Sequence, residues 1–416
     1  MKTAAAGDNR ATAVTVRFVR PGAVAVVSLV AAALGAAGVL VVGKSAGWVG
    51  SKQETVVVRS PIVDRGTPAP VVVAKPLAGN GFEPAQIYRN RSAGVVTIFS
   101  YFNDPHSASA SAGQGSGFVV SKDGLILTDA HVITTAGEGR QGDVAAAKQI
   151  YVEFQDGDRL TAKIVGWDLF DDVGVLRVKP RLHGLAPVPL GDSSRVVVGE
   201  PVAAIGSPFG NENSLSVGVV SAIRREIGSL TSRFDLVDAI QIDAPINHGN
   251  SGGPLFDARG RVIGINAQIR SSEGAGFEGV GFAVPINSAK RTMRQLVTSG
   301  RVSYAYVGIS TVDLTQSIAR KYGYGTQRGA LVDKVEDGTA AQKAGIRAGS
   351  TPATLNGLVF NVGGDAIVRI GDERVTSAAD VVRIVTTKLL PGQVVNFTLI
   401  RNGERLVVPV RLSTRP

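Results

Sequence analysis

The chain has 416 residues, more than one ordinary domain needs, so we expect two folded units with additional non-globular segments. It contains no cysteine, which excludes a disulfide framework, a thiol nucleophile and a cysteine-based metal site. Its net charge of +10 is not gathered into Lys/Arg runs with interleaved aromatic residues, so nucleic acid is not expected as a partner.

The N-terminal segment predicts a membrane anchor. Residues 1–20 carry basic side chains, whereas residues 21–43 carry no charged side chain and consist mainly of Ala, Val, Leu and Gly. That stretch is long enough to cross a bilayer core of roughly 30 Å, and the basic residues before it place the N-terminus in the cytoplasm. A cleaved signal peptide is the alternative, but its apolar region is only about 7–15 residues long. We therefore expect a single-pass protein of the cell membrane, with a cytoplasmic tail over 1–20, a transmembrane helix over 21–43 and an extracytoplasmic remainder.

The region after this helix divides into a linker and two folded units. Residues 44–82 contain several prolines and show neither a period of 2 nor one of 3.6, which predicts a flexible linker. The folded part changes character near Gly300, so we expect one unit over residues 83–299 and a second over residues 300–414.

The first unit is mostly β. Short apolar runs such as Leu125–Thr128 and Val262–Ala267 alternate with Gly, Asp and Asn turns. Many short strands at this spacing indicate a β-barrel or a β-sandwich. Residues 286–299 instead place their apolar side chains at helical spacing, which predicts one amphipathic helix ended by Gly300.

The second unit is a small α+β domain. Its strand-like pieces include residues 330–335 and 394–400, and helix-like pieces occupy residues 340–344 and 378–387. The first helix-like piece is followed directly by Gly345, which is a stop signal.

The segment Asn-His-Gly-Asn-Ser-Gly-Gly-Pro over residues 247–254 supplies a candidate nucleophile, Ser251. Serine needs a neighbouring base, a group that orients the base, and donors for the oxyanion that forms. The flanking glycines allow a sharp turn that can aim the backbone amides of Gly249 and Ser251 at one point, an oxyanion hole. The alternative is a Gly-rich hairpin loop with an incidental serine.

A candidate base and its orienting acid precede this serine. His131 lies at the end of a strand-like run, although a lone histidine there is often only a core residue. Asp172 directly precedes another strand, and Asp168 and Asp171 compete with it for the role of orienting acid. The order His, Asp, Ser along the chain is that of the chymotrypsin-type triad. The histidines are scattered, so no metal site is expected.

Seven motifs carry a resemblance to a known family. They are residues 115–120 (GSGFVV), 128–132 (TDAHV), 172–176 (DVGVL), 206–210 (GSPFG), 217–222 (VGVVSA), 241–247 (QIDAPIN) and 281–285 (GFAVP). With them the chain resembles the HtrA/Deg-type trypsin-like serine proteases over about residues 83–414. The family's aspartate immediately precedes an apolar-small-apolar-Leu strand, so the resemblance selects Asp172 rather than Asp168 or Asp171.

The second unit resembles a PDZ domain. Tyr306, Val307, Gly308 and Ile309 match the loop that holds the carboxylate of a peptide C-terminus, and the strand after it offers an edge for an added peptide strand. Residues 350–362 form an insertion between two other motifs of this domain.

The resemblance implies both a fold and a function. The fold is a trypsin-like double β-barrel with the site between the barrels, followed by the PDZ domain. The function is an ATP-independent serine endopeptidase without a cofactor, which cleaves unfolded or mislocalised extracytoplasmic proteins. The PDZ domain binds peptide C-termini, and the family implies homotrimers.

Four residues depart from the family pattern and leave an alternative function open. The family commonly has Asn at Asp129, Ala at Gly174, Ala at Pro245 and Pro at His248. The last two flank the loop that shapes the oxyanion hole. The alternative is a membrane-tethered chaperone or PDZ scaffold whose protease domain is latent.

Overall fold

The computed structural model describes residues 81–103, 112–138, 144–207, 214–229, 231–232, 235–246, 249–267 and 279–415. The predicted tail and membrane helix, residues 1–20 and 21–43, lie outside these ranges, as do residues 44–80 of the predicted linker. Within the described ranges, no helix combines the length and the apolar character needed to span a bilayer.

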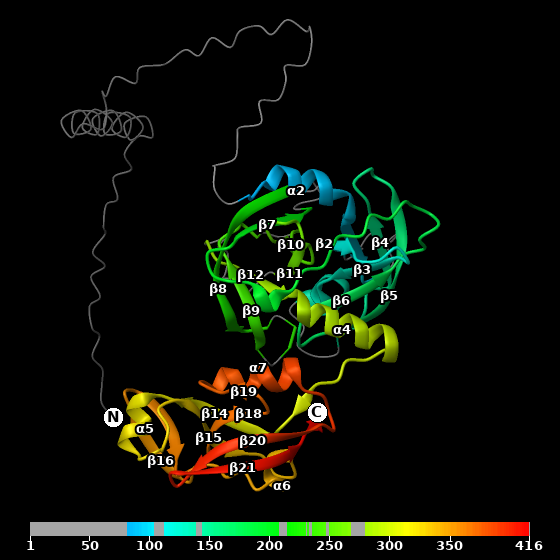
Figure 1. The fold of residues 1–416 in the computed structure, drawn as a ribbon. Helices are drawn as coiled ribbons and strands as arrows, with labels where there is room; N and C mark the ends of the chain where they lie inside the picture. Colours follow the sequence, from blue (N-terminus) through cyan, green and yellow to red (C-terminus); the bar gives the residue numbers. More distant parts are fainter. Residues whose placement is uncertain are drawn as a thin grey trace, which may run out of the picture. The chain divides into compact units, whose positions relative to one another are not determined.

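The first six strands form a closed barrel in the order β1-β2-β3-β6-β5-β4 (Figure 1). Antiparallel pairing of β1 with β4 closes it. Short apolar runs build these strands, and their inward side chains, among them Ile98, Ile126 and Leu176, are fully buried. The strands are β1 (Val95–Tyr101), β2 (Ala112–Val119), β3 (Leu125–Thr128), β4 (Gln149–Glu153), β5 (Arg159–Asp168) and β6 (Val173–Arg177).

The next six strands form a second closed barrel in the order β10-β11-β12-β9-β8-β7. One hydrophobic cluster runs through both barrels, joining Val95 and Phe118 of the first to Ala203 and Phe256 of the second. The double barrel expected from the resemblance is therefore confirmed. The strands are β7 (Pro201–Gly206), β8 (Ser214–Ile227), β9 (Leu236–Ile242), β10 (Pro254–Phe256), β11 (Val262–Ala267) and β12 (Gly281–Pro285).

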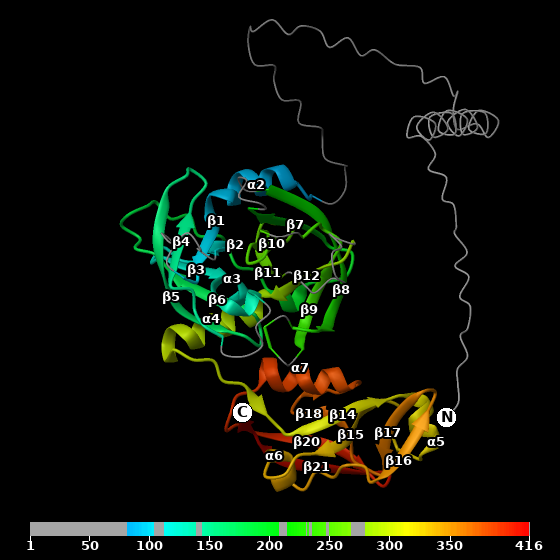
Figure 2. The same ribbon diagram turned by 180° about the vertical axis from the view of Figure 1, so that it is seen from behind.

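Three α-helices of the described residues accompany the barrels. Helix α2 (Pro84–Arg91) begins with a proline, which is well suited to the first helical turn because it lacks an N–H to satisfy. The short α3 (Ala130–Ile133) follows β3 and lies beside β6 (Figure 2). Helix α4 has the predicted bounds, Ile286–Ser299, and Gly300 ends it with a left-handed φ of 69°.

The C-terminal unit is the expected α+β domain. Its main sheet has the order β14-β15-β18-β20-β21, with β19 paired to β18, and its strands β16 and β17 form the predicted insertion as a hairpin. The strands are β13 (Ala305–Tyr306), β14 (Ile309–Leu314), β15 (Gly329–Val335), β16 (Thr351–Leu355), β17 (Leu358–Val362), β18 (Ala366–Ile370), β19 (Glu373–Arg374), β20 (Val394–Arg401), β21 (Glu404–Arg411) and β22 (Ser413–Thr414). The helices are α5 (Gln316–Lys321), α6 (Ala340–Lys343) and α7 (Ala378–Lys388).

Candidate active site

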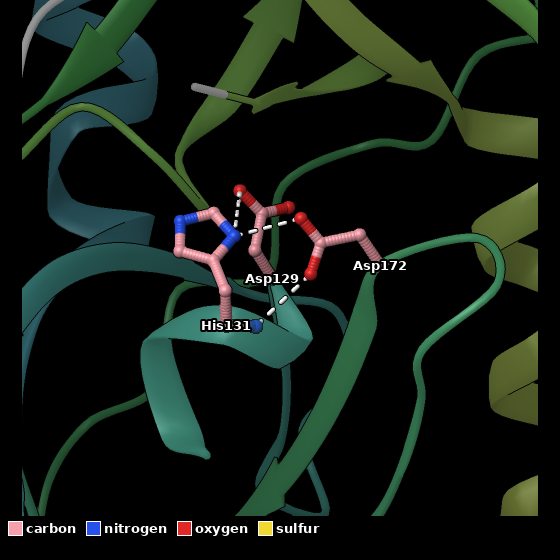
Figure 3. A group of neighbouring side chains, drawn as sticks. All are labelled: Asp129, His131 and Asp172. Carbon is pink, nitrogen blue, oxygen red and sulfur yellow. Dashed lines mark hydrogen bonds and ion pairs between the residues drawn. The ribbon is translucent and has the colours of Figure 1, made fainter. Parts of the chain in front are cut away.

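His131 and Asp172 meet in a two-point contact (Figure 3). Helix α3 carries His131 away from the end of β3, and Asp172 lies just before β6, the strand that pairs with β3. The ring Nδ1 lies 2.7 Å from Asp172 Oδ2, and the backbone N–H of His131 donates to Asp172 Oδ1 at 2.9 Å. The carboxylate therefore fixes both the ring and the start of the helix that carries it.

Asp172 adopts an unusual backbone conformation, with a φ of 51°. Few residues other than glycine adopt this region, so the surrounding contacts must hold it. One such contact is the N–H of Ala130, which donates to the Asp172 carbonyl at 3.2 Å. Side chain and backbone of Asp172 thus both face α3.

The two competing aspartates bond elsewhere. Asp168 accepts hydrogen bonds from the hydroxyls of Tyr304 and Thr292, and Asp171 forms an ion pair with Arg291 at 2.7 Å. Burial, followed by the neighbouring charge of Asp171, raises the pKa of Asp168 to about 7. Both side chains hold the loop before Asp172 against α4 and the segment after it.

Ser251 lies in a tight turn that residues from the first barrel hold in place. Gly249 and Gly252 take left-handed φ values of 100° and 83°, and a Cβ on Gly252 would overlap the Ser116 carbonyl. Ser116 on β2 donates its backbone N–H to the Ser251 carbonyl at 2.8 Å and its hydroxyl to the Gly249 carbonyl at 2.5 Å. The Ser251 hydroxyl is buried and makes no hydrogen bond within the described part of the chain.

Ser116 is a residue whose role the sequence did not indicate. It lies in the Gly-Ser-Gly motif at residues 115–117, and that motif was the only available signal. His248 and Asn247, which precede the turn, lie outside the described residues.

The charges around His131 favour its protonated form. Burial opposes that form, but the Asp172 carboxylate, with its hydrogen bond, and then Asp129 outweigh burial and raise the pKa of His131 to about 9. A charged imidazole is thus stabilised here, as a triad requires once the ring has accepted a proton.

A second acid, Asp129, completes the group (Figure 3). One oxygen or nitrogen atom from each of Asp129, His131 and Asp172 lies within 4.8 Å of the others. Carboxylates and an imidazole at such distances also occur as ligands in metal sites. The direct 2.7 Å hydrogen bond between Nδ1 and Asp172 already uses two of these donors. The geometry is therefore that of groups sharing protons, and we assign no metal ligand among them.

The predicted peptide-binding loop lies between β13 and β14. Gly308 has a left-handed φ of 81°, and a Cβ there would overlap the Thr339 side chain. The carbonyls of Val307 and Gly308 accept hydrogen bonds from the N–H groups of Ala341 and Glu336, at 2.9 and 3.0 Å. The loop is thus fixed by the start of α6 and the end of β15.

Comparison with protein families gives two matches. Residues 115–265 match a family described as a trypsin-like peptidase domain, and residues 305–412 match the PDZ domain family.

Two curated proteins named "Probable periplasmic serine endoprotease DegP-like" are similar to the chain. The one from Hahella chejuensis is 35% identical over 361 residues, which cover 85% of this chain and 70% of that protein. The one from Pseudomonas fulva is 38% identical over 303 residues, which cover 73% of this chain and only 56% of that protein.

Two solved structures are similar as well. The HtrA-type protease AlgW with a tripeptide is 30% identical with a TM-score of 0.63, covering 80% of this chain and 98% of that one. The serine endoprotease from Yersinia pestis is 28% identical with a TM-score of 0.54, again covering 80% of this chain and 98% of that one.

Proposed function

The chain belongs to the HtrA/DegP-like family of trypsin-like serine proteases with a C-terminal PDZ domain, and from this membership we propose that it hydrolyses peptide bonds with Ser251 as nucleophile. The observation that carries the proposal is the two-point contact of His131 with Asp172. In the proposed mechanism the Ser251 hydroxyl attacks the substrate carbonyl, and Nε2 of His131 accepts its proton. Asp172 accepts from Nδ1–H, which keeps the ring in the tautomer that leaves Nε2 free.

The proposed oxyanion hole consists of the backbone amides of Gly249 and Ser251. Such donors stabilise the negative oxygen of the tetrahedral intermediate. The left-handed φ of Gly249 and the hydrogen bonds from Ser116 to this turn support the proposal, because they fix the turn without using either amide.

Substrates, location and assembly are proposed from the family resemblance. We propose that the chain cleaves unfolded or mislocalised proteins outside the cytoplasm, a location supported by the word "periplasmic" in the names of its relatives. Residues 21–43 are proposed to hold it in the membrane, with residues 83–299 as the protease domain. Residues 300–414 are proposed to bind peptide C-termini at Tyr306, Val307, Gly308 and Ile309, and the active assembly is proposed to be a homotrimer.

One observation favours the second candidate, a chaperone or scaffold with a latent protease. The buried Ser251 hydroxyl makes no hydrogen bond within the described residues, so no hydrogen bond joins the serine to the imidazole. A protease at rest would need this contact to form before proton transfer.

Labelling with a fluorophosphonate and cleavage of unfolded casein distinguish the two functions. We expect wild type to label at Ser251 and to cleave casein, and Ser251→Ala to do neither. Ser100→Ala is the matched control, because Ser100 is another buried serine of the same domain whose hydroxyl has no hydrogen-bond partner among the described residues. A wild-type chain that neither labels nor cleaves, even with a C-terminal peptide added, would leave the latent function as the better one.

A further inference from the structure

A second carboxyl group faces the imidazole that Asp172 orients. Asp129 precedes α3, its side chain is fully buried, and its Oδ2 lies 3.9 Å from Nδ1 of His131. Figure 3 shows this carboxyl group beside both His131 and Asp172. Two acids therefore act on one ring nitrogen, whereas the proposed mechanism uses only one of them.

The surroundings of Asp129 do not suit an isolated negative charge. Neither of its oxygens has a hydrogen-bond partner among the described residues. A buried carboxylate without donors is strongly disfavoured unless an opposite charge lies close by. Among the described residues, the titratable groups that shift its pKa are Asp172 and His131, and the backbone N–H of Gly252 lowers it as well. Burial, and then the charge of Asp172, raise the pKa of Asp129 well above its ordinary value.

Two arrangements of the same protons are then possible. In one, Asp129 is a neutral acid and the His131 ring is neutral. In the other, Asp129 is ionised and the ring is an imidazolium, which offsets the buried charge. The number of protons and the total charge are equal in both, so the 3.9 Å separation makes the two titrations a coupled pair.

Only the first arrangement can start the reaction. A neutral ring has a free Nε2 that can accept the Ser251 proton, whereas an imidazolium has none. We propose that Asp129 is a positioning residue that sets the charge of His131, so that, while the two groups share one proton, the ring acts as a base only when Asp129 holds that proton. The inference rests on the proposed protease function. It adds one residue of this chain, Asp129, that controls whether the base His131 is protonated.

The test compares kcat/KM as a function of pH for wild type and Asp129→Asn, because this ratio reports the ionisation of the free enzyme's base. Asparagine has the same shape, cannot ionise, and is the residue common in the family at this position. We expect the apparent pKa of the base to fall by about one unit or more, the size expected for a unit charge about 4 Å away. At neutral pH kcat/KM should rise roughly tenfold, mainly through kcat. An unchanged pH profile would overturn the inference.

Asp257→Asn is the matched control. Asp257 is also a buried aspartate of the protease unit, but it pairs with Arg261 at 2.7 Å. We expect this variant to keep the wild-type pH profile. If it shifted the profile as much as Asp129→Asn, the effect would belong to buried aspartates in general and the inference would fail.

A second measurement needs no change at Asp129. In Ser251→Ala, NMR titration of the His131 ring nitrogens should show a second step from the coupled carboxyl group. A single one-proton transition would overturn the inference, even if Asp129→Asn failed to fold.

Fluorophosphonate labelling separates the two proposals. Wild type that never labels contradicts the protease function, whereas normal labelling with an identical pH dependence in Asp129→Asn contradicts only the role of Asp129.

Discussion

Asp168 shows how a single buried residue can make stability depend on pH. Its carboxyl group accepts from Tyr304 and Thr292, and burial raises its pKa to about 7. The folded protein therefore retains this proton at pH values where the unfolded chain has lost it. The resulting stabilisation is fully present below the ordinary pKa of 3.8 and is lost as the pH rises through about 7.

We expect Asp168→Asn to remove this pH dependence. For wild type, the free energy of unfolding should fall between pH 5 and pH 7 by on the order of 1 kcal/mol per pH unit, whereas the variant should show a flatter profile. Urea unfolding at several pH values measures both. Asp257→Asn serves as control, since that buried aspartate is ion-paired. Equal slopes for wild type and Asp168→Asn would contradict the assignment.

At the scale of the elements, the nucleophile turn depends on Gly252. A side chain there would require a left-handed φ and would also overlap the Ser116 carbonyl. We expect Gly252→Ala to lower the free energy of unfolding by roughly 3 kcal/mol and to suppress labelling of Ser251. Gly300→Ala is the matched control, because Gly300 has a φ of 69° but open space around it, so its cost should be only about 1 kcal/mol. Urea unfolding of both variants measures the difference, and equal costs would show that contact with Ser116 is unimportant.

Local patterns were sufficient for many elements. The bounds of β3, β11 and α4 match their predicted runs, because short apolar runs between turn residues, helical spacing and a terminal glycine are all local signals. The insertion at residues 350–362 was expected, but its hairpin of β16 and β17 was not.

The candidate site was only partly predictable from sequence. The residue types and their order pointed to His131, Asp172 and Ser251. The left-handed φ of Asp172, the bonds from Ser116 and the approach of Asp129 to His131 all arise from tertiary packing of segments far apart in the chain. No local pattern encodes such distances.

At the scale of the whole molecule, the C-terminal unit has an open sheet edge, which is the proposed site for a second polypeptide. Strand β14 is at one edge of its sheet and directly follows the loop at Gly308. We expect a peptide with a free C-terminal carboxylate to bind there, and the same peptide with an amidated end to bind at least about tenfold more weakly. Fluorescence anisotropy with labelled peptides measures both affinities.

Two glycine variants test the location of this binding. Gly308→Ala should weaken binding of the free-acid peptide, because the new Cβ would overlap Thr339. Gly338→Ala is the control, since Gly338 also has a positive φ but no atom of the described residues within 4 Å of its Cβ position. Equal affinity of the free-acid and amidated peptides, or an unaffected Gly308→Ala, would place the peptide site elsewhere.

The order of the strands also bears on aggregation. Unpaired strand edges can recruit other extended chains, and the unfolded polypeptides proposed as substrates would be such chains. Both barrels are closed and offer no edge. The main C-terminal sheet has two edges, and β21 bears exposed Glu404, Arg405 and Pro409, which discourage strand addition. The opposite edge, β14, has no proline, so an incoming chain can join this sheet at one side and cannot easily bridge one molecule to the next.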